Sequence, residues 1–446
     1  MNTPIVDFVK EYADSNPLRF HMPGHKGNTV LGYENFDITE IDGADVLYSA
    51  SGIIAESQKN ATELFGTKAT LYSTEGSSLC IRAMLYLIKC YAMQNGKNPI
   101  IAACRNAHKT FVTAAAVLDM DVDWLLPNDS KSVISCIADA AFLDRYLQKA
   151  TEKPVAVYIT SPDYLGNITD INALSRVCHK HEVLLIVDNA HGAYLKFLPE
   201  DIHPINVGAD MCCDSAHKTL PVLTGGAYLH IAKATPDFFA ENAQRALSVF
   251  ASTSPSYLIL QSLDMANKYI ADGYCRRLSQ FVIKVKALKE SLIKNGYTLC
   301  GDEPLKITIA TKSYGYTGCE LSNILLNKNI VCEFADPDYI IFMLTPQISE
   351  EGLEKLKKVL CDISKKTPIT KPLPKPVIKS NKISLSEALF APQEKINVEN
   401  CLEKISASTD IACPPAIPIV LPGEIIDDRA IECFKYYGIK EWSVIK

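Results

Sequence analysis

The chain has 446 residues, of which 48% are hydrophobic and 22% are charged, and its formal net charge is −6. These values are typical of a folded protein with two or three domains, and they exclude a fibrous or intrinsically disordered chain. A mildly acidic chain without a long basic cluster has no field that attracts nucleic acid or an anionic membrane, so we expect neither as a partner.

The cysteines and the N-terminus give no sign of a metal centre or of export. The 15 cysteines are scattered, and no pair has the Cys-x-x-Cys spacing of common zinc and redox sites. The first ten residues contain no apolar signal core, and the longest apolar runs, such as Val183–Val187, are too short to span a bilayer. We therefore expect a cytoplasmic protein with reduced cysteines and no metal.

Two helices are predicted before residue 95. One covers Glu56–Phe65 and ends at Gly66, because glycine readily adopts the left-handed conformation that closes a helix. The other covers Ser77–Ala92 and begins directly after Thr74-Glu75-Gly76. The free amides at the start of this second helix favour anion binding.

Residues 99–231 alternate short β-branched runs with amphipathic stretches, which is typical of a mostly parallel sheet with crossover helices. Helices are expected at Lys131–Gln148 and Ile171–Lys180, each after polar capping residues. The predicted strands are Pro99–Ala103, Val122–Leu126, Val155–Thr160, Val183–Val187, Ala209–Cys213 and Ala227–Ile231. The pattern predicts an α/β domain.

The pattern changes after Pro255. A long helical stretch, Tyr257–Asn295, precedes strands predicted at Leu305–Ala310 and Tyr339–Leu344 with a helix between them, which indicates a smaller α+β domain. Lys365–Ser380 mixes four prolines with basic residues and is interpreted as a linker. In the last segment, helices are expected at Ser384–Ala391 and Glu399–Ser406, before a proline-dense loop at Cys413–Gly423.

These patterns divide the chain into five parts. The predicted parts are an N-terminal segment at 1–55, a large α/β domain at 56–255, a small α+β domain at 256–364, a linker at 365–382 and a C-terminal domain at 383–446.

A lysine follows one of the predicted strands. The run Asp210–Thr219 passes from a strand into a polar turn, which places Ser215, His217 and Lys218 just beyond the carboxyl end of that strand. In an open α/β sheet, such residues face the ligand crevice. A partly buried lysine loses its proton more easily and can then attack an aldehyde. For a single lysine at this position, the ordinary alternative is a solvated surface residue.

The preceding strand ends in Asp188, followed by His191 and Gly192. An aspartate there can hold the pyridine nitrogen of pyridoxal phosphate (PLP) in its protonated form, which makes the ring an electron sink. His191 could then pack beside the cofactor or the substrate. The ordinary alternative is a carboxylate that caps the following turn.

Two further segments can serve the same cofactor. Gly76, Ser77 and Ser78 begin a predicted helix, where hydroxyls and free amides can bind a phosphate, although a plain helix cap is the commoner use of such residues. His108 follows a predicted strand, so its imidazole could stack on the pyridine face, with a structural histidine as the alternative.

Taken together, the motifs resemble the bacterial ornithine/lysine/arginine decarboxylase family, which are PLP enzymes of the aspartate-aminotransferase fold (fold type I). The resemblance covers nearly the whole chain. The motifs that carry it are His21–Gly27, Thr39-Glu40 with Gly43, Arg105–Thr110, Ser161–Gly166, Asp188–Gly192, Ser215–Lys218, Ser252–Tyr257 and Cys413–Glu424.

The resemblance implies a role for each site residue. Lys218 would hold PLP as a Schiff base, Asp188 would pair with the pyridine nitrogen, and His108 would stack on the ring. The residues that would hold the phosphate are Ser77, Ser78, Ser215 and His217.

The resemblance also implies an active site built between two subunits. Thr253 would reach the phosphate bound by the partner subunit, and Glu424 is a candidate for binding the distal cation of the substrate, with a surface acid as its alternative. The chain resembles the short form of the family, so we expect a homodimer or a dimer of dimers. Three departures from the usual motifs, at Asn189, at Glu75 and at Tyr48-Ser49, leave the substrate open.

The expected function is PLP-dependent decarboxylation of arginine, lysine or ornithine to the corresponding amine, a step of polyamine metabolism. His217 or Lys218 would then protonate Cα. Two alternatives stay open: another fold-type-I reaction, such as that of an aminotransferase or a different lyase, and a catalytically silent homologue that binds PLP or a polyamine.

Overall fold

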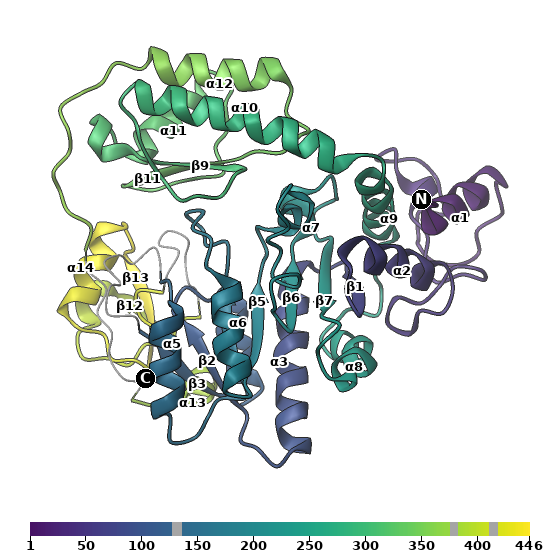
Figure 1. Ribbon diagram of the computed structural model, residues 1–446, viewed down its shortest axis with the longest axis horizontal. Coiled ribbons are helices and arrows are strands. Elements are labelled where there is room, and N and C mark those ends of the chain that lie inside the picture. The colour runs from purple at the N-terminus through teal and green to yellow at the C-terminus, as the bar shows by residue number, and fades with distance from the viewer. Residues whose placement is uncertain (127–135, 375–381, 410–417) are drawn as a thin grey trace. The chain divides into compact units, whose positions relative to one another are not determined.

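Figure 1 shows the computed structural model, which describes residues 1–126, 136–374, 382–409 and 418–446. The chain contains two compact units. Unit 1 comprises Met1–Lys97 and Leu184–Leu278, and unit 2 comprises Asn98–Val183 and Ser279–Lys446. Within the described ranges, no helix is both long enough and apolar enough to cross a membrane.

Four strands of unit 1 lie in the order β1-β7-β6-β5 (Figure 1). β5 and β6 are parallel, whereas β7 runs antiparallel to both β6 and β1. The elements of unit 1 are α1 (Pro4–Asp14), α2 (Ile53–Phe65), β1 (Ala69–Ser73), α3 (Gly76–Gln94), β5 (Leu184–Asp188), β6 (Met211–Asp214), α7 (Ala216–Thr219), β7 (Ala227–Ile231), α8 (Asp237–Ser248) and α9 (Tyr257–Ala271), with short 3₁₀ turns at Glu34–Phe36, Leu47–Ser49 and Ala193–Phe197.

The strands of unit 1 are apolar because both of their faces are covered. Every residue of β6 and β7 is buried, so neither sequence alternates between apolar and polar residues as a half-exposed strand would. The chain passes from β1 into α3 through Gly76, whose φ of +72° is a conformation that few other residues adopt. This turn places the first amides of α3 beside the ends of the strands.

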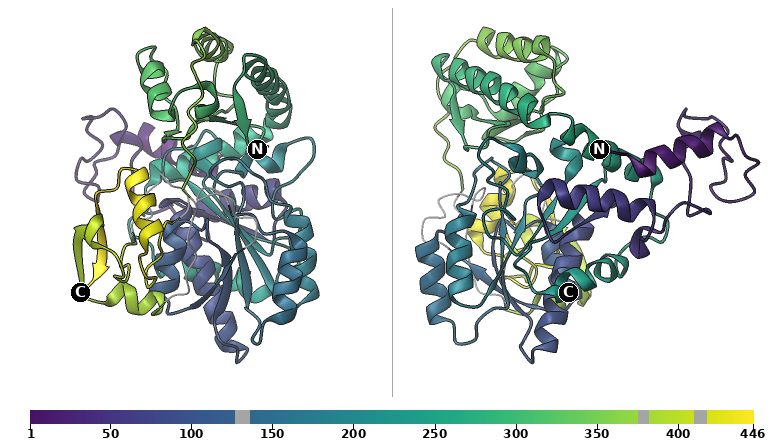
Figure 2. Two further views of the ribbon diagram at one scale, coloured as in Figure 1. Left: turned by 90° about the vertical axis from the view of Figure 1, so that its left-hand side faces the viewer. Right: turned by 45° about the vertical axis from the view of Figure 1, so that its right-hand side comes forward.

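A buried carboxylate anchors the N-terminal helix of unit 1. Asp264 of α9 is fully buried and accepts hydrogen bonds from the amides of Ile5 and Val6 at 3.0 and 3.1 Å, and from the hydroxyl of Ser57. These amides belong to the first turn of α1, where backbone donors lack partners within the helix. Figure 2 shows α1 beside α2 in its right-hand view.

Replacing Asp264 should destabilise the protein in a pH-dependent way. Asp264→Ala leaves buried donors unpaired and should lower the free energy of unfolding by about 3 kcal/mol. Burial raises the pKa of Asp264 from 3.8 to about 6, so its contribution to stability is complete at low pH and is lost as the pH rises through about 6. Denaturant unfolding of the wild type and Asp264→Asn should therefore show a difference that decreases between about pH 4 and pH 6; a pH-independent difference would contradict this assignment.

The described part of unit 2 contains three strand groups. The parallel strands β4, β2 and β3 form one group, β10-β11-β9-β8 form an antiparallel sheet with α10, α11 and α12 on one side of it in Figure 1, and β12 pairs with β13. Unit 2 contains β2 (Ile100–Cys104), α4 (Lys109–Val117), β3 (Asp121–Leu125), α5 (Ala140–Lys149), β4 (Ala156–Thr160), α6 (Ile171–Lys180), most of α10 (Tyr274–Lys294), β8 (Thr298–Cys300), β9 (Lys306–Ala310), α11 (Gly318–Leu326), β10 (Phe334–Ala335), β11 (Tyr339–Met343), α12 (Glu350–Asp362), α13 (Leu385–Phe390), β12 (Gln393–Asn397), α14 (Asp428–Tyr436) and β13 (Glu441–Ile445), with 3₁₀ turns at Thr311–Tyr314 and Val398–Asn400.

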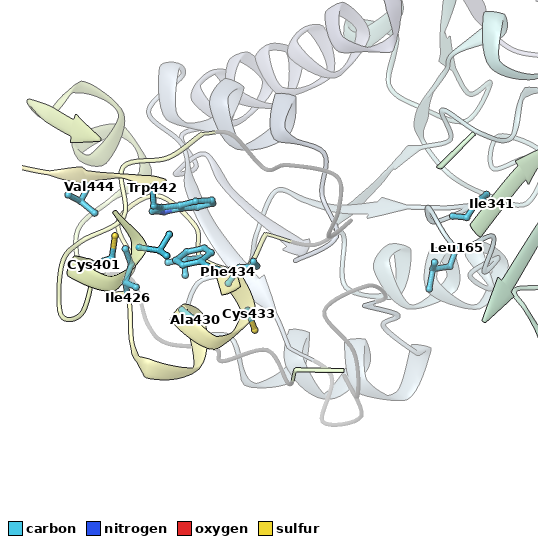
Figure 3. Close-up of a cluster of buried hydrophobic side chains, with 12 residues drawn as sticks. Leu165, Ile341, Cys401, Ile426, Ala430, Cys433, Phe434, Trp442 and Val444 are labelled. Carbon is cyan, nitrogen blue, oxygen red and sulfur yellow. The ribbon is translucent and has the colours of Figure 1, made fainter. Parts of the chain in front are cut away.

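The C-terminal segment has an apolar core of its own within unit 2. Figure 3 shows Phe434 of α14 facing Trp442 of β13, and their ring centroids lie 4.4 Å apart. Ile426, Cys401 and Val444 pack around these rings, and the cluster extends to Leu165 and Ile341. The Trp442 indole nitrogen donates a hydrogen bond to the Ser406 hydroxyl, so the one polar atom of this ring is satisfied.

The expected fold class is confirmed: an α/β protein with a mostly parallel sheet, a small α+β part and a C-terminal segment. All eight predicted strands are present within about two residues of the expected bounds, and Ile171–Lys180 is a helix as expected. The helix expected at Lys131–Gln148 begins only at Ala140, because Asp139 is its N-cap, and its first five residues lie outside the described ranges.

Two other helix predictions need correction. The stretch Tyr257–Asn295 is divided into α9 and α10 at Asp272-Gly273, where glycine has a φ of +86°. No helix forms at Glu399–Ser406; the chain makes a 3₁₀ turn there and then bridges Ile405 to Ile425, since its apolar residues serve the C-terminal core. The Lys365–Ser380 linker has no regular structure up to Pro374, where the described range stops.

Candidate active site

The candidate site of unit 1 lies where two parallel strands end. Asp188 is the last residue of β5 and pairs in register with Cys213 of β6. Ser215 follows β6 directly and leads into the short helix α7, which contains His217 and Lys218. Parallel pairing therefore brings an acid and an amine from different strand units to the same edge of the sheet.

The acid and the amine are both engaged with neighbouring residues. The Oδ1 atom of Asp188 accepts the amide of Ala190 at 3.1 Å and lies 3.7 Å from the Cys213 thiol. The ammonium nitrogen of Lys218 lies 3.2 Å from Nε2 of His191, which comes from the turn after β5. Asp188 and His191 are buried and Lys218 is partly exposed, so the lysine remains accessible from one side.

The start of α3 meets the turn after β6. The Ser215 hydroxyl donates to the Ser77 hydroxyl at 2.8 Å, although the two residues are 138 positions apart in the sequence. The Gly76 amide donates to the carbonyl of Gly225 at 2.7 Å, which holds this helix start against the turn before β7. Two hydroxyls at a helix N-terminus form a group of donors suited to a phosphate.

The surroundings of His217 favour a neutral imidazole. Its Nδ1 atom donates to the carbonyl of Gly226 at 3.1 Å. Burial lowers the pKa of His217, and the charge of Lys218 lowers it further against the opposing effect of the Gly226 carbonyl. A neutral ring that donates through Nδ1 keeps a lone pair on Nε2, so His217 can accept a proton.

Other residues predicted for the site lie elsewhere in the chain. His108 belongs to unit 2; it is exposed, and its Nδ1 atom caps α4 by accepting the amide of Thr110 at 3.2 Å. Thr253 lies on an exposed turn of unit 1, where the neighbouring amide of Ser252 donates to Glu75. An exposed Thr253 is compatible with the expected contribution to a partner subunit, which stays a prediction.

Glu424 is a buried residue of unit 2 and not a surface acid. It forms a two-point ion pair with Arg105, and the second contact, between Nη2 and Oε2, measures 2.9 Å. The side chains of Arg105 and Glu424 are 4% and 3% exposed. A cationic substrate group would therefore have to share this carboxylate with a guanidinium. Residues 413–417 of the proline-dense loop before Glu424 lie outside the described residues.

Sequence reasoning missed one group of polar residues beside the site. Asp214 occurs within the strand-to-lysine motif, but nothing in the local pattern links it to Asn189, His203 and His230. In the structure these four side chains form one buried hydrogen-bonded cluster. A histidine in an otherwise apolar strand, such as His230 in β7, is the sequence feature that could have indicated a buried polar cluster.

Breaking the Arg105–Glu424 pair should destabilise unit 2 strongly. Glu424→Ala leaves a buried guanidinium without its partner and should lower the free energy of unfolding by about 3–5 kcal/mol. The double change Arg105→Met with Glu424→Leu should cost clearly less than the sum of the single changes, because it removes both charges.

The exposed pair of Lys395 and Glu441 provides the control for this experiment. Its side chains are 65% and 55% exposed, so Lys395→Ala should cost less than about 1 kcal/mol. Denaturant unfolding of the variants measures these differences. Equal costs for the buried and the exposed pair would contradict the assigned role of Arg105.

The chain is similar to decarboxylases along most of its length. Residues 3–298 match the family described as Orn/Lys/Arg decarboxylase, major domain. The arginine decarboxylase of Bacillus subtilis (strain 168) is 28% identical over 463 residues, which cover 96% of this chain and 92% of that protein. The arginine decarboxylase of Halalkalibacterium halodurans is 28% identical over 469 residues, which cover 96% of this chain and 91% of that protein.

Solved structures share the fold. Lysine decarboxylase A from Pseudomonas aeruginosa has a TM-score of 0.82 at 14% identity, covering 99% of this chain and 80% of its own. The lysine decarboxylase LdcF of Francisella novicida has a TM-score of 0.77 at 15% identity, covering 100% of this chain and 81% of its own. Since the family match alone covers more than half of the sequence, the protein is a member of the Orn/Lys/Arg decarboxylase family.

Proposed function

We propose that the protein is a PLP-dependent enzyme that decarboxylates arginine, lysine or ornithine. The observation that carries the proposal is the junction in unit 1 where Lys218, Asp188 and the Ser77–Ser215 pair come from separate segments to one edge of the sheet. Membership of the decarboxylase family supports the reaction class.

The residues present fit PLP by their chemistry. Lys218 supplies an amine for the aldehyde carbon, and Asp188 supplies a carboxylate for the pyridine nitrogen. Gly76 and Ser77 begin α3, and the hydroxyl of Ser215 contacts that of Ser77, so hydroxyls and the helix dipole there favour a phosphate. Ser78, one residue further along α3, is proposed as a further phosphate donor, together with His217.

When bound, PLP supplies an electron-accepting ring that takes up the negative charge left on Cα as CO₂ departs. Asp188 would keep the pyridine nitrogen protonated, since an adjacent carboxylate favours the charged form. His191 would orient Lys218, and Lys218, or His217 once its Nε2 atom has taken up a proton, would deliver a proton to Cα afterwards. His108 is proposed to stack on the ring.

The substrate class rests on the relatives. Those named above as arginine decarboxylases cover almost the whole chain, and the solved structures with the same fold are named as lysine decarboxylases. Arginine is therefore the first substrate to test, beside lysine and ornithine. Glu424 stays a candidate for the distal cation of the substrate, shared with Arg105.

Lys218→Ala should abolish covalent attachment of the cofactor and decarboxylation together, because the variant lacks the amine that attacks the aldehyde carbon. Borohydride reduction followed by peptide mass spectrometry locates the modified lysine. Release of labelled CO₂ from carboxyl-labelled arginine, lysine and ornithine measures the reaction. The matched control is Lys233→Ala, an exposed lysine of the same unit, which should keep both properties.

Three results would count against the proposal. A cofactor attached to a different lysine would exclude Lys218 from its assigned role. A keto acid formed together with pyridoxamine phosphate would identify an aminotransferase. A colourless protein that binds no PLP would favour a silent homologue.

The expected contribution of Thr253 across a subunit interface can be tested by mixing inactive subunits. If Lys218→Ala and Thr253→Ala are each inactive, mixed dimers should contain one intact site, and random mixing should restore up to about a quarter of the wild-type activity. The measurement is CO₂ release after refolding the two variants together. Activity no higher than that of the separate variants would place Thr253 in the same subunit as its own Lys218.

A further inference from the structure

A second carboxylate is buried beside the candidate site and has no part in the proposed chemistry. Asp214, the last residue of β6, is fully buried. Its Oδ2 atom accepts hydrogen bonds from Nε2 of His203 and Nε2 of His230, both at 3.0 Å, and its Oδ1 atom accepts the amide group of Asn189 at 2.7 Å. Three donors therefore converge on one carboxylate.

The histidines of this cluster are also fixed from outside. Nδ1 of His230 lies 2.9 Å from the Thr70 hydroxyl, which lies 2.7 Å from the hydroxyl of Thr67. The Phe65 ring packs on both imidazoles, with ring centroids 4.4 Å from His230 and 5.5 Å from His203. Apolar surroundings strengthen the charge interactions of the cluster because they exclude water.

Asp214 keeps its negative charge. Burial alone would raise its pKa, but the imidazoles of His203 and His230 outweigh burial and hold the pKa well below its usual value. Burial lowers the pKa of His230, so this imidazole favours its neutral form. Charge–dipole contacts thus hold a carboxylate inside the protein.

The cluster is tied directly to the proposed cofactor site. Asn189 follows Asp188, and Asp214 precedes Ser215, so one side-chain hydrogen bond joins the ends of both strands that carry the site. The Asn189 backbone amide also donates to the Cys213 carbonyl at 3.0 Å. A Cβ on Gly192 would lie 2.0 Å from Oδ1 of Asn189, so glycine at this position leaves room for that side chain.

We propose that Asp214 is a positioning residue for the PLP site, acting through Asn189. It holds Asp188 and α7 at a fixed separation, and its charge adds to the negative potential that favours a protonated pyridine nitrogen. This inference rests on the proposed function, because it presumes PLP at Lys218 and Asp188. The inference also requires one amide and one acid at positions 189 and 214, because the amide donates the hydrogen bond that the carboxylate accepts.

His203, Asp214 and His230 each offer one atom that could bind a metal ion, and these three atoms lie within 4.8 Å of one another. The separations of 3.0 Å are those of N–H···O hydrogen bonds, and they leave the carboxylate fully satisfied. A hydrogen-bonded cluster therefore accounts for the geometry. Metal analysis of the purified protein provides the check, and one zinc per chain would overturn the positioning role in favour of a metal site.

Exchanging the amide and the acid tests the pairing. Asn189→Asp alone places two carboxylates in contact and should lower the melting temperature and weaken PLP binding by roughly tenfold or more. Adding Asp214→Asn should reverse much of both losses, since the amide introduced on β6 can accept from the histidines and donate to the carboxylate introduced after β5. Asp214→Asn alone should preserve most of the stability but weaken PLP binding several-fold.

The measurements are the melting temperature of the apoprotein, the PLP dissociation constant by titration, and the pH dependence of the visible absorbance of the bound cofactor. Asp264→Asn is the control, because it changes another fully buried acid of unit 1, one whose hydrogen bonds go to α1 and α2. It should change stability with the pH dependence described above for this residue, and it should leave PLP affinity unchanged.

Two outcomes would overturn the inference. One is a double variant no more stable than Asn189→Asp. The other is restored stability with the same PLP affinity and absorbance in all variants, which would leave Asp214 a structural residue only. Failure of the proposed function looks different: the wild type would then bind no PLP at Lys218, or would bind it without releasing CO₂.

Discussion

The candidate site depends on the junction between the carboxyl ends of β5 and β6. One backbone hydrogen bond, from Asn189 to the Cys213 carbonyl, and one side-chain hydrogen bond, from Asn189 to Asp214, close this junction. Asp188 lies on one side of it, and Ser215 with α7 on the other. A slip of one residue in the pairing would turn Asp188 to the opposite face of the sheet, so the junction determines whether acid and lysine can act on one ligand.

The two carboxylates at this junction are kept apart by the alternation of side chains along a strand. Consecutive residues point to opposite faces, so Cys213 contacts Asp188 whereas Asp214 contacts Asn189. Each acid has its own donors: Ala190 and Cys213 for Asp188, and the histidine cluster for Asp214. Two carboxyl groups thus lie on neighbouring strands without direct contact between them.

In unit 2, a buried ion pair joins two segments that are distant in sequence. Arg105 follows β2 and Glu424 belongs to the Pro-Gly-Glu loop, so their contact fastens the C-terminal segment to the strand that precedes α4. Burial of the apolar core around Phe434 and Trp442 stabilises this segment. The ion pair favours one arrangement of the segment, because any arrangement that separated the two buried charges would leave each without a partner. Any cationic group that approached Glu424 would have to share its carboxylate with Arg105.

The sequence by itself determined the alternation of strands and helices and the residues at the strand ends. The six strands predicted within residues 99–231 form, and Asp188, Ser215 and Ser77 lie at the strand ends and the helix start where the sequence placed them, because hydrophobic periodicity and helix starts depend on neighbours in the chain. Tertiary structure decided which of these residues meet. The Ser77–Ser215 contact, the enclosure of Asp214 by His203 and His230, the Arg105–Glu424 pair and the loss of the helix expected at Glu399–Ser406 all depend on partners distant in sequence. Such contacts are set by strand register and by the burial of charge in the folded chain, and no local pattern encodes them.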